Sequence, residues 1–591
     1  MADGTLMSSV AAWFVTPEEP PPPPKSFVED VGLRTLLLSS AVLVYLAVHL
    51  YREHRRLPSI RIGLFETLRN YKPGVHLEFY HDTWMNRSFR KTFSVKVPHD
   101  PRIFATCDPA IVEHVLITKG PAFYEKGPQW RTAFHDLLGG GIFNADGDHW
   151  KLQRKLAAHE FSVRSLRDFM TTTFRAHVGK LCEIVDAHAG APFDVQQLFA
   201  RYTLDSIGQI GFGVEIGCLD DKEGQDEERK AFAAAFDTST NLIGNRFVDP
   251  LWKIKRLLAR TPLARGYEAE LRKAIAVVNA WSKKIIAERR NSSDVASRTD
   301  ILSRFMTTTG GDDTALRDVV INFILAGRDT TAILLTWTMY ELSSKPHVVA
   351  KLRAEAARAK REGERLEADG GFGFSALTRM PYLKATLTEV LRLHPSVPLD
   401  FKAATADDTL PDGTRLKKGE RVMFVAWSMG RDATIWERPD EFDPLRFIDA
   451  EGNFRFPPMA SFPVFLAGPR TCLGKDMAYL GAGLLLTALL ERYDLELACD
   501  PKERLNGEWH GHATHARGVT YGLGLTLWVH GGLPVRLARR AATHPRFVKG
   551  ATVADAYPVG AAAADDDGEE VTLGEAKTIQ LSAKDFVKKG A

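Results

Sequence analysis

The chain has 591 residues, of which 45% are hydrophobic and 26% are charged, as in a globular protein with a large core. Its formal net charge of +3 is too small to indicate a nucleic-acid-binding protein. The five cysteines show no paired spacing, which argues against a disulfide framework and favours a reducing compartment.

The first 34 residues are rich in proline and carry several acids. The unbroken run from Pro20 to Pro24 favours extended backbone over helix. Acids such as Glu18 and Asp30 argue against a plastid or mitochondrial transit peptide. We expect residues 1–34 to form a short lumenal segment.

Residues 35–51 form an apolar run of 17 residues without Asp, Glu, Lys or Arg. This length lies at the short end for a transmembrane helix and suits the thin bilayer of the endoplasmic reticulum. The alternative is a buried core helix. Arginines cluster after the run, whereas only Lys25 and Arg34 lie close before it. The positive-inside rule then predicts a single-pass anchor with everything after Tyr51 in the cytosol.

A globular domain is expected from residue 60 to residue 540. Short strand-like runs occur at 91–97, 102–105, 419–425 and 518–528. Between 161 and 288 the apolar spacing is helical. The composition of residues 541–591, rich in Ala, Asp and Glu, predicts a disordered tail.

Two segments leave alternatives open. Residues 245–260 hold Trp252 among basic residues and could rest on a membrane surface or pack on the core. His510, His512 and His515 form H-x-H-x-x-H, which is either a metal site or a polar surface loop.

Trp150 and Arg154 form W-x-x-x-R and would lie on one helical face. An indole N–H and a guanidinium together suit the recognition of a carboxylate. The alternative is an exposed cation over an aromatic ring.

The run 321–331 reads I-N-F-I-L-A-G-R-D-T-T inside a long apolar helix. Ala326 and Gly327 remove bulk from one turn, while Asp329 and Thr330 supply an acid and an alcohol. A threonine in mid-helix can bond to the carbonyl four residues earlier, here that of Ala326, and loosen the helix. The alternative is a kink with a solvated aspartate.

Glu389 and Arg392 form E-x-x-R on one face of an apolar helix. Downstream, the segment 439–447 supplies a second arginine, Arg446. If these three residues are buried together, they would form a structural network, and removal of one partner would leave a buried charge unpaired.

The run 465–474 reads F-L-A-G-P-R-T-C-L-G and frames Cys472 with Phe465, Gly468, Arg470 and Gly474. Glycines allow close approach to a flat ligand, and nearby amides with Arg470 would favour the thiolate that binds metal. An apolar helix follows, with its positive end toward the sulfur. Single thiolate ligation of iron is typical of haem monooxygenases. The alternative is a buried structural cysteine.

These motifs, in this order, resemble the cytochrome P450 superfamily from about residue 60 to residue 540. Finer runs resemble plant and algal long-chain fatty-acid hydroxylases, namely G-I-F-N-A-D-G-D-H-W (141–150), H-E-F-S (159–162), A-G-R-D-T-T (326–331), V-P-L-D-F-K (397–402) and L-P-D-G-T (410–414). The resemblance implies a mainly α fold, the cytochrome P450 fold with a small β region, and haem b as the cofactor.

The resemblance also assigns residues to roles. Cys472 would be the axial iron ligand, in a loop with Phe465, Gly468 and Gly474. Trp150, Arg154 and Arg470 would hold the haem propionates, with Lys402 where many relatives carry an arginine. Ala326 and Gly327 would leave room for O₂, and Asp329 and Thr330 would deliver protons.

The implied reaction takes R–H, O₂, two electrons and two protons to R–OH and water. Because no strand–G-x-G-x-x-G–helix unit is present, electrons would come from NADPH through a partner cytochrome P450 reductase. Lys151, Lys155 and Lys475 are candidates for its docking face.

The expected substrate is a long-chain fatty acid, hydroxylated at or near its methyl end. Val397, Pro398 and Leu399, with the turn at 527–533, would narrow the approach to the iron, and Arg246 or Lys253 would hold the carboxylate. The alternatives are a sterol or terpenoid substrate, a reductase-independent isomerase or dehydratase of lipid hydroperoxides, and a haem sensor. The Asp329–Thr330 pair disfavours the last two.

Overall fold

The computed structural model describes residues 60–62, 77, 81, 91–96, 101–220, 226–247, 249, 251–261, 264–291, 300–308, 312–361, 372–498 and 519–540. The chain divides into two units, Met1–Arg540 and Ala541–Ala591, and the described residues all belong to the first. The expected lumenal segment 1–34, the anchor 35–51, the three histidines at 510, 512 and 515, and the tail 541–591 lie outside the described residues.

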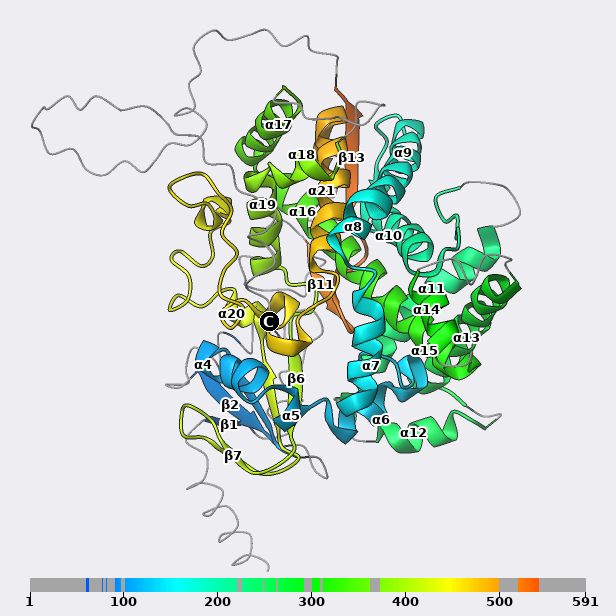
Figure 1. Ribbon diagram of the computed structural model, residues 1–591, viewed down its shortest axis with the longest axis vertical. Coiled ribbons are helices and arrows are strands. Elements are labelled where there is room, and N and C mark those ends of the chain that lie inside the picture. The colour runs from blue at the N-terminus through cyan, green and yellow to red at the C-terminus, as the bar shows by residue number, and fades with distance from the viewer. Residues whose placement is uncertain are drawn as a thin grey trace, which may run out of the picture. The chain divides into compact units, whose positions relative to one another are not determined.

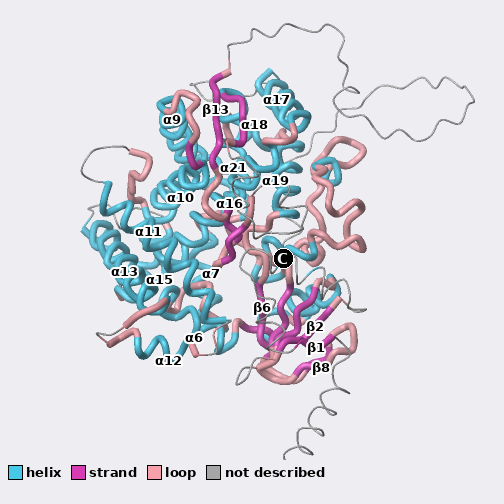
Figure 2. The backbone as a smooth tube through the Cα atoms, turned by 180° about the vertical axis from the view of Figure 1, so that it is seen from behind, coloured by secondary structure: helices cyan, strands magenta, loops and turns pink. Residues whose placement is uncertain are grey.

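A small β region is present, and three of its strands, β2, β3 and β9, lie in runs that the sequence predicts, whereas β1, β4 and β6 were not predicted. Its six-stranded sheet has the order β1-β2-β3-β9-β6-β4, with β1 (Ile60–Ile62), β2 (Thr92–Val95), β3 (Ile103–Thr106), β4 (Tyr124–Glu125), β6 (Asp400–Ala404) and β9 (Arg421–Phe424). The pairs β2–β3 and β6–β9 are antiparallel, whereas β3 and β9 run parallel. Figure 2 shows these strands gathered apart from the main body of helices.

Helices make up most of the described chain. A long helix crosses it as α15 (Asp313–Ile324), η5 (Leu325–Asp329) and α16 (Thr330–Leu342). Every residue of α16 after the first is buried, as expected for a helix that is apolar all round. Figure 1 shows α16 beside α21 (Lys475–Arg492), with α19 (Pro381–Leu393) on one side and α9 (Thr171–Ala187) on the other.

The remaining helical segments complete this body. They are α4 (Pro109–Glu113), η2 (His114–Thr118), α5 (Gly120–Phe123), α6 (Gly127–Leu138), α7 (Gly147–Ala158), α8 (Val163–Ser165), η3 (Leu166–Met170), α10 (Val195–Phe212), α11 (Asp226–Ile243), η4 (Gly244–Phe247), α12 (Trp252–Leu258), α13 (Tyr267–Asn291), α14 (Ile301–Thr308), α17 (Pro346–Arg361), α18 (Phe374–Thr378), α20 (Ala426–Met429), η6 (Pro444–Phe447), η7 (Pro463–Phe465) and η8 (Gly468–Arg470). The mainly α prediction is confirmed.

One helix of the described chain, Asp313–Leu342, is long and apolar enough to cross a membrane. Its apolar window is 83% buried within the protein, so it is a core helix. This helix carries the predicted A-G-R-D-T-T run at its centre.

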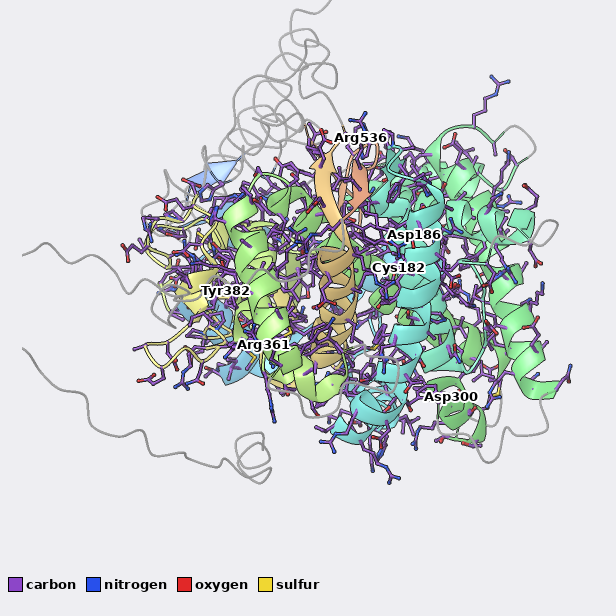
Figure 3. The ribbon with its side chains drawn as sticks, turned by 90° about the horizontal axis from the view of Figure 1, so that it is seen from above. Cys182, Asp186, Asp300, Arg361, Tyr382 and Arg536 are labelled. Atoms are coloured by element: carbon purple, nitrogen blue, oxygen red, sulfur yellow. The ribbon has the colours of Figure 1, made fainter. Side chains whose placement is uncertain are left out.

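Shorter strands fix the C-terminal part of the domain to the helices. The sheet β10-β13-β5 consists of β10 (Tyr493–Leu497), β13 (Pro534–Arg539) and β5 (Phe193–Asp194). The Tyr493 hydroxyl donates to the Cys182 carbonyl at 3.1 Å and to Asp186 at 2.9 Å. Figure 3 shows Cys182 and Asp186 on α9, close to β13 with Arg536.

Two hairpins complete the β region, namely β7 (Asp408–Thr409) with β8 (Arg415–Leu416) and β11 (Tyr521–Leu523) with β12 (Leu527–Val529). The strand-like run predicted over 518–528 is therefore not continuous, because a turn between Leu523 and Leu527 divides it into two antiparallel strands.

Candidate active site

Cys472 lies in a tight turn between η8 and α21. Its backbone N–H donates to the Phe465 carbonyl at 2.8 Å, and the Thr471 N–H donates to the Gly468 carbonyl at 3.0 Å. Cys472 is a free cysteine with an exposed side chain. The alternative of a buried structural cysteine is therefore wrong.

Gly468 is required for packing within this turn. Its φ is +62°, and a Cβ at this position would lie 2.2 Å from the Leu116 carbonyl oxygen of η2. We expected this glycine to permit close approach to a flat ligand, but its missing side chain instead lets η2 and η8 come together. Gly474 is different, since a Cβ there would lie 3.9 Å from the Cys472 sulfur without a clash.

Several groups act on the Cys472 sulfur. Although the Cys472 side chain is accessible to solvent, the protein packed around the turn partly desolvates the sulfur and raises the pKa of its thiol, while the Gly474 N–H, Arg154 and Lys475 oppose that shift. The sequence pointed to Arg470 as the stabilising cation, but Arg154 and Lys475 take that place. A bound metal deprotonates a coordinating thiol outright, so the raised pKa does not oppose a metal-ligand role.

Trp150, Arg154 and Arg470 converge on one place, where the motif spacing predicts the first two and the resemblance adds Arg470. The Arg470 guanidinium lies 4.4 Å from the centre of the Trp150 ring and that of Arg154 lies 5.7 Å from it. Trp150 and Arg470 are both buried, and Arg154 is half-buried. The alternative, a cation over the Trp150 ring, is therefore present in Arg154, but that cation is not fully exposed. The Arg470 Nε is buried without a hydrogen-bond partner among the described residues.

Buried charges surround Arg470, and of these the sequence pointed only to Lys402. Arg470 donates to Asp146 at 2.5 Å, while Lys126 and Lys402 approach Asp400 at 3.3 and 2.6 Å. Burial lowers the pKa of Lys402 to about 7 against the opposing effect of Asp400. Lys402 is thus paired with Asp400, and its expected contact with a propionate receives no support.

The predicted A-G-R-D-T-T run (326–331) forms a widened turn within the long helix, which we call the oxygen-activating turn after its expected role. Residues Leu325–Asp329 have π-helical geometry, which is frequent at functional sites. The Thr330 hydroxyl donates to the Ala326 carbonyl at 2.7 Å, so the predicted back-bond and the loosened helix are confirmed.

Gly327 serves the contact between this turn and α10. A Cβ on Gly327 would lie 2.7 Å from Cγ1 of Ile207. The space that this glycine leaves is thus taken by α10, whereas the sequence suggested room for O₂ there. Ala326 keeps a small side chain on the same turn.

Asp329 is buried and ion-paired, so the alternative of a solvated aspartate is wrong. It is 8% exposed, and its carboxylate lies 2.7 Å from Arg328. Burial raises the pKa of Asp329 to about 6, Arg328 opposes this rise, and Asp237 adds to it. A carboxyl group with this pKa can exchange protons near neutral pH.

The E-x-x-R network is present as predicted. Arg392 donates to Glu389 at 2.7 and 2.8 Å, and Arg446 donates to the same carboxylate at 3.1 Å. Glu389 and Arg392 have fully buried side chains. Arg392 also donates to the carbonyls of Pro439 at 2.5 Å and Glu441 at 2.8 Å, so the network fixes the segment before the cysteine turn.

An aromatic cluster links this network to the cysteine turn. The Arg392 guanidinium lies 5.7 Å from the Trp436 ring. Neighbouring ring centres are 5.6–6.4 Å apart along the series Trp436, Phe447, Phe462, Phe456 and Phe465. The expected support of the cysteine turn by the network is therefore indirect and runs through packed rings.

The expected constriction residues lie next to the oxygen-activating turn. Val397 is 37% exposed, Pro398 is buried and Leu399 is half-buried. The preceding Ser396 donates to the Thr330 carbonyl at 2.8 Å and accepts from the Leu527 N–H at 3.0 Å. The sequence did not single out Ser396, which joins both parts of the expected constriction to the helix.

Arg246 is not available to hold a substrate carboxylate. Its buried guanidinium makes two 2.7 Å hydrogen bonds to Glu268 and one of 2.8 Å to Asp136. Lys253 is exposed on α12. Of the two cations considered for the carboxylate, only Lys253 remains a candidate.

Three lysines were expected to form a docking face for an electron donor. Lys151 and Lys155 are exposed on α7, and Lys151 pairs with Asp148 at 2.9 Å. Lys475 begins α21, beside the cysteine turn, and lies 4.5 Å from the Phe456 ring. All three have accessible or partly accessible side chains.

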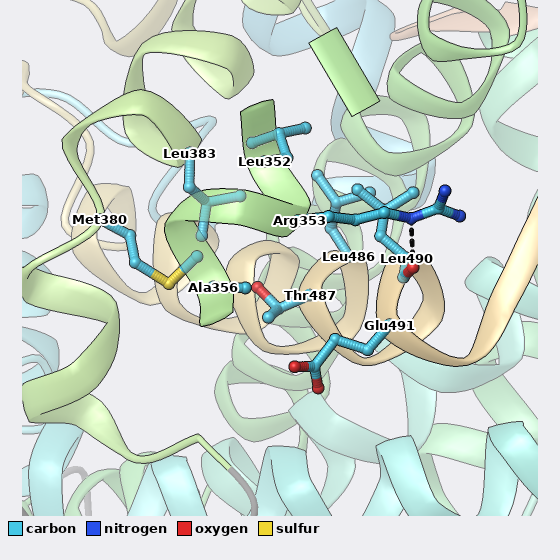
Figure 4. A pocket seen from close by; sticks show the side chains of 9 residues that line it. All are labelled: Leu352, Arg353, Ala356, Met380, Leu383, Leu486, Thr487, Leu490 and Glu491. Carbon is cyan, nitrogen blue, oxygen red and sulfur yellow. Dashed lines mark hydrogen bonds between the residues drawn. The ribbon is translucent and has the colours of Figure 1, made fainter. Parts of the chain in front are cut away.

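A separate pocket lies where α17, α19 and α21 pack together (Figure 4). It is lined by Leu352, Arg353, Ala356, Met380, Leu383, Leu486, Thr487, Leu490 and Glu491. Arg353 donates across it to the Leu490 carbonyl at 2.8 Å. None of the predicted site residues lines this pocket, so it is not the candidate active site.

The residues near Cys472 fit an iron porphyrin. The exposed sulfur offers one soft donor for iron, and the unpartnered Arg470 Nε with the Trp150 indole suits a carboxylate such as a haem propionate. Among the described residues, no group of three His, Cys, Asp or Glu could hold a metal ion in another way.

Comparison with known proteins agrees with this geometry. The family model described as Cytochrome P450 matches residues 64–521. Cytochrome P450 CYP94D108 of Paris polyphylla is 37% identical over 444 residues, which cover 74% of this chain and 84% of the relative. Cytochrome P450 94B1 of Arabidopsis thaliana is 36% identical, with 78% and 87% covered.

Cytochrome P450 704C1 of Pinus taeda is also 36% identical, with 79% of this chain and 93% of the relative covered. The family match spans the described site, from Trp150 to Cys472. This chain therefore belongs to the cytochrome P450 family of haem-dependent monooxygenases.

Proposed function

We propose that this cytochrome P450 hydroxylates a long-chain fatty acid at or near its methyl end. Membership of the family gives the coarser function, a monooxygenase that uses haem, a redox partner and a lipophilic substrate. The resemblance of the finer sequence runs to plant fatty-acid hydroxylases supports the substrate, and the relatives named above are plant proteins.

The site residues take the following roles in this proposal. Cys472 ligates the iron, Trp150, Arg154 and Arg470 hold the propionates, and Phe465, Gly468 and Gly474 shape the turn around the sulfur. Ala326 and Gly327 belong to the turn where oxygen is activated. A haem with a thiolate ligand supplies the cleavage of O₂ needed for oxygen insertion.

Asp329 and Thr330 deliver protons in this proposal. Thr330 orders its hydroxyl on the Ala326 carbonyl, and Asp329 is buried one residue earlier with a pKa near 6. A group whose pKa lies near the working pH is suited to give up a proton and regain one. Glu389, Arg392 and Arg446 support the site without taking part in the chemistry.

The observation that carries the proposal is the link made by Ser396. Its hydroxyl fixes the exposed Val397 to the Thr330 carbonyl, and its carbonyl fixes Leu527. Methyl C–H bonds are stronger than interior ones, so attack at the chain end requires a narrow approach that denies access to the weaker bonds. The loop of Val397, Pro398 and Leu399, held beside the oxygen-activating turn by Ser396, is suited to this restriction.

Membrane attachment would place the site where fatty acids partition. The apolar run 35–51 is the proposed anchor in the endoplasmic reticulum, with the catalytic domain in the cytosol. On α12 and beside it, Leu251, Ile254, Leu257 and Leu258 are 55–65% exposed and alternate with lysines and arginines, as in helices that lie at a membrane interface. NADPH–cytochrome P450 reductase is the proposed electron donor.

Product analysis tests this function. The full chain, in membranes with a competent reductase, is supplied with fatty acids, sterols and terpenoids, and we expect NADPH-dependent hydroxylation of long-chain fatty acids near the methyl end. Val397→Ala should move the hydroxyl toward interior carbons. Val277→Ala, at a position of similar exposure on α13 (40% against 37%), is the matched control and should leave the product unchanged.

Two results would contradict the proposal. Oxidation of sterols or terpenoids with fatty acids left untouched would exclude the substrate class but keep the monooxygenase. Conversion of lipid hydroperoxides without NADPH or reductase would instead indicate an isomerase or dehydratase.

A further inference from the structure

Arg328, the residue before Asp329, is shared by two carboxylates from different helices. Its Nη1 lies 2.7 Å from Asp329 in the oxygen-activating turn and 2.7 Å from Asp237 on α11. Arg328 is 4% exposed. Its Nε is buried and has no hydrogen-bond partner among the residues that the structure describes. One buried cation therefore serves both acids through the same nitrogen.

Surrounding contacts hold Arg328 in this position. The Thr203 hydroxyl of α10 donates to the Arg328 carbonyl at 2.9 Å, and the guanidinium lies 5.4 Å from the Phe236 ring of α11. Asp237 has a side chain that is 55% exposed. The shared cation thus connects an acid at the surface with an acid in the interior.

The charge balance around Arg328 decides what Asp329 can do. An arginine within contact distance lowers the pKa of a carboxyl group by about 1–3 units, and a carboxylate held permanently ionised cannot donate a proton. The guanidinium itself does not release protons in proteins. Arg328 can therefore influence proton delivery only through its charge, and Asp237 competes with Asp329 for that charge.

We propose that Asp237 is a positioning residue for proton delivery, because it takes a share of the Arg328 guanidinium and so leaves Asp329 able to accept and release a proton. This inference rests on the proposed role of Asp329. In each turnover Asp329 would pass its proton toward Thr330 and regain one from water, so that the carboxyl group is unchanged overall.

The neighbouring titratable groups do not replace Asp237. Cys218, in the loop after α10, is affected by Arg328, Asp205 and Arg229, but burial raises the pKa of its thiol and it stays neutral. On α11 and η5, the charged groups that act on Asp329 are Asp237 and Arg328. Asp237 and Arg328 are therefore expected to act on the pKa of Asp329 in opposite directions.

Removal of Asp237 and removal of Arg328 should shift the pH profile of product formation in opposite directions. In Asp237→Asn, Arg328 acts on Asp329 alone, so the pKa of Asp329 falls and the descending limb of product formation moves to lower pH, by about one unit. In Arg328→Gln the cation is lost, so the same limb moves to higher pH. A general loss of structure would not produce opposite shifts.

The experiment uses the full chain in membranes with NADPH–cytochrome P450 reductase and whichever lipid the substrate panel identifies. Product, NADPH consumption and hydrogen peroxide are measured across pH for Asp237→Asn, Arg328→Gln and Asp329→Asn. Asp237→Glu keeps the carboxylate and should resemble the wild type. Glu228→Gln is the matched control, because Glu228 also lies on α11, is 58% exposed and forms an ion pair, here with Lys284 at 2.6 Å.

We expect Asp237→Asn to lose coupling several-fold at neutral pH with its haem thiolate spectrum intact, and Glu228→Gln to match the wild type. An unchanged profile for Asp237→Asn, in a protein where Asp329→Asn is uncoupled, would overturn this inference alone. If Asp329→Asn itself stays coupled, the proposed proton-delivery role fails as well. Should Asp237→Asn not assemble with haem, Asp237→Ser takes its place, with the same expected shift to lower pH, and an unchanged profile in that variant overturns the inference.

Discussion

At the scale of single residues, the hydroxyl of Thr330 is the group whose role in the site is most directly tested by substitution. It is held at 2.7 Å from the Ala326 carbonyl, in position to orient a proton donor. We expect Thr330→Ala to keep haem but to divert electrons to hydrogen peroxide, so that product formed per NADPH falls about tenfold. Thr330→Ser should retain most of the coupling.

The same helix provides a control for this prediction. Thr338 makes an equivalent back-bond to the Leu334 carbonyl at 2.7 Å, two turns after the oxygen-activating turn. Thr338→Ala should remove a similar hydroxyl and leave the coupling unchanged. Unchanged coupling in Thr330→Ala, measured by stoichiometry of NADPH, peroxide and product, would show that its hydroxyl has no role in proton delivery.

Glu389 is the shared counter-charge of two arginines, Arg392 and Arg446. Its carboxylate accepts from Arg392, from Arg446 and from the Asp443 N–H at 2.7 Å. Glu389→Gln would leave the two arginines without a buried counter-charge, so we expect a loss of about 3–5 kcal/mol in the free energy of unfolding. Thermal unfolding and haem retention measure this loss.

An exposed ion pair shows, by comparison, how much stability a surface charge contributes. Glu496 approaches Arg536 at 3.9 Å with both side chains largely exposed, and such pairs contribute about 0–1 kcal/mol. Glu496→Gln should therefore change stability little. Equal effects of the two substitutions would mean that the Glu389 network does not stabilise the fold through its charge.

The sequence could predict the site residues that act through short motifs. Glu389–Arg392 and Ala326–Thr330 are each one helical turn apart, so their geometry follows from helix periodicity alone. Asp237, Asp146 and Asp400 could not be predicted, because they meet Arg328 and Arg470 only after distant parts of the chain pack together. Arg246 shows the reverse, since burial against Glu268 removed a cation that looked available in sequence.

At the scale of elements, the approach of α10 to the oxygen-activating turn depends on Gly327. A Cβ there would lie 2.7 Å from Ile207. Gly327→Ala should cost about 1–3 kcal/mol through overpacking and should disturb coupling, because it pushes η5 away from α10. Ile207→Ala in the same chain should relieve the clash and restore part of the stability.

A glycine on another helix serves as a control that separates the effect of packing from the effect of helix propensity. A Cβ added to Gly179 on α9 would have no atom within 4 Å, so Gly179→Ala should stabilise the protein by about 0.5–1 kcal/mol. Thermal unfolding of the haem-loaded proteins measures all three variants. A stabilising effect of Gly327→Ala similar to that of Gly179→Ala would contradict the packing role.

Secondary structure is predicted best where one hydrophobic period continues through a long segment. The apolar run after Cys472 is the helix α21, as expected, since its buried face extends all round. The segment 518–528 is harder, because strand-like residues continue through the turn at Gly524. Its division into β11 and β12 is fixed by tertiary contacts, including the Leu527 N–H bond to Ser396.

At the scale of the whole molecule, the exposed apolar side of α12 indicates how substrate could arrive from a membrane. Leu257 is 65% exposed and Ile254 is 58% exposed, and burial of such side chains in the interfacial layer contributes about 25 cal/mol per Å² of apolar surface. Leu257→Glu should oppose this insertion. The proposed anchor 35–51 is unchanged in this variant, so the expected change is a several-fold higher KM for a long-chain fatty acid in vesicles with kcat retained.

This prediction is tested by supplying the fatty acid in two ways, in vesicles and in detergent micelles. Because the defect concerns access from the bilayer, Leu257→Glu should behave like the wild type when the fatty acid is supplied in detergent micelles. Val163→Glu, at a position that is 59% exposed on α8, adds the same charge elsewhere and should leave both KM values unchanged. Equal KM values for Leu257→Glu and the wild type in vesicles would show that α12 does not guide substrate from the membrane.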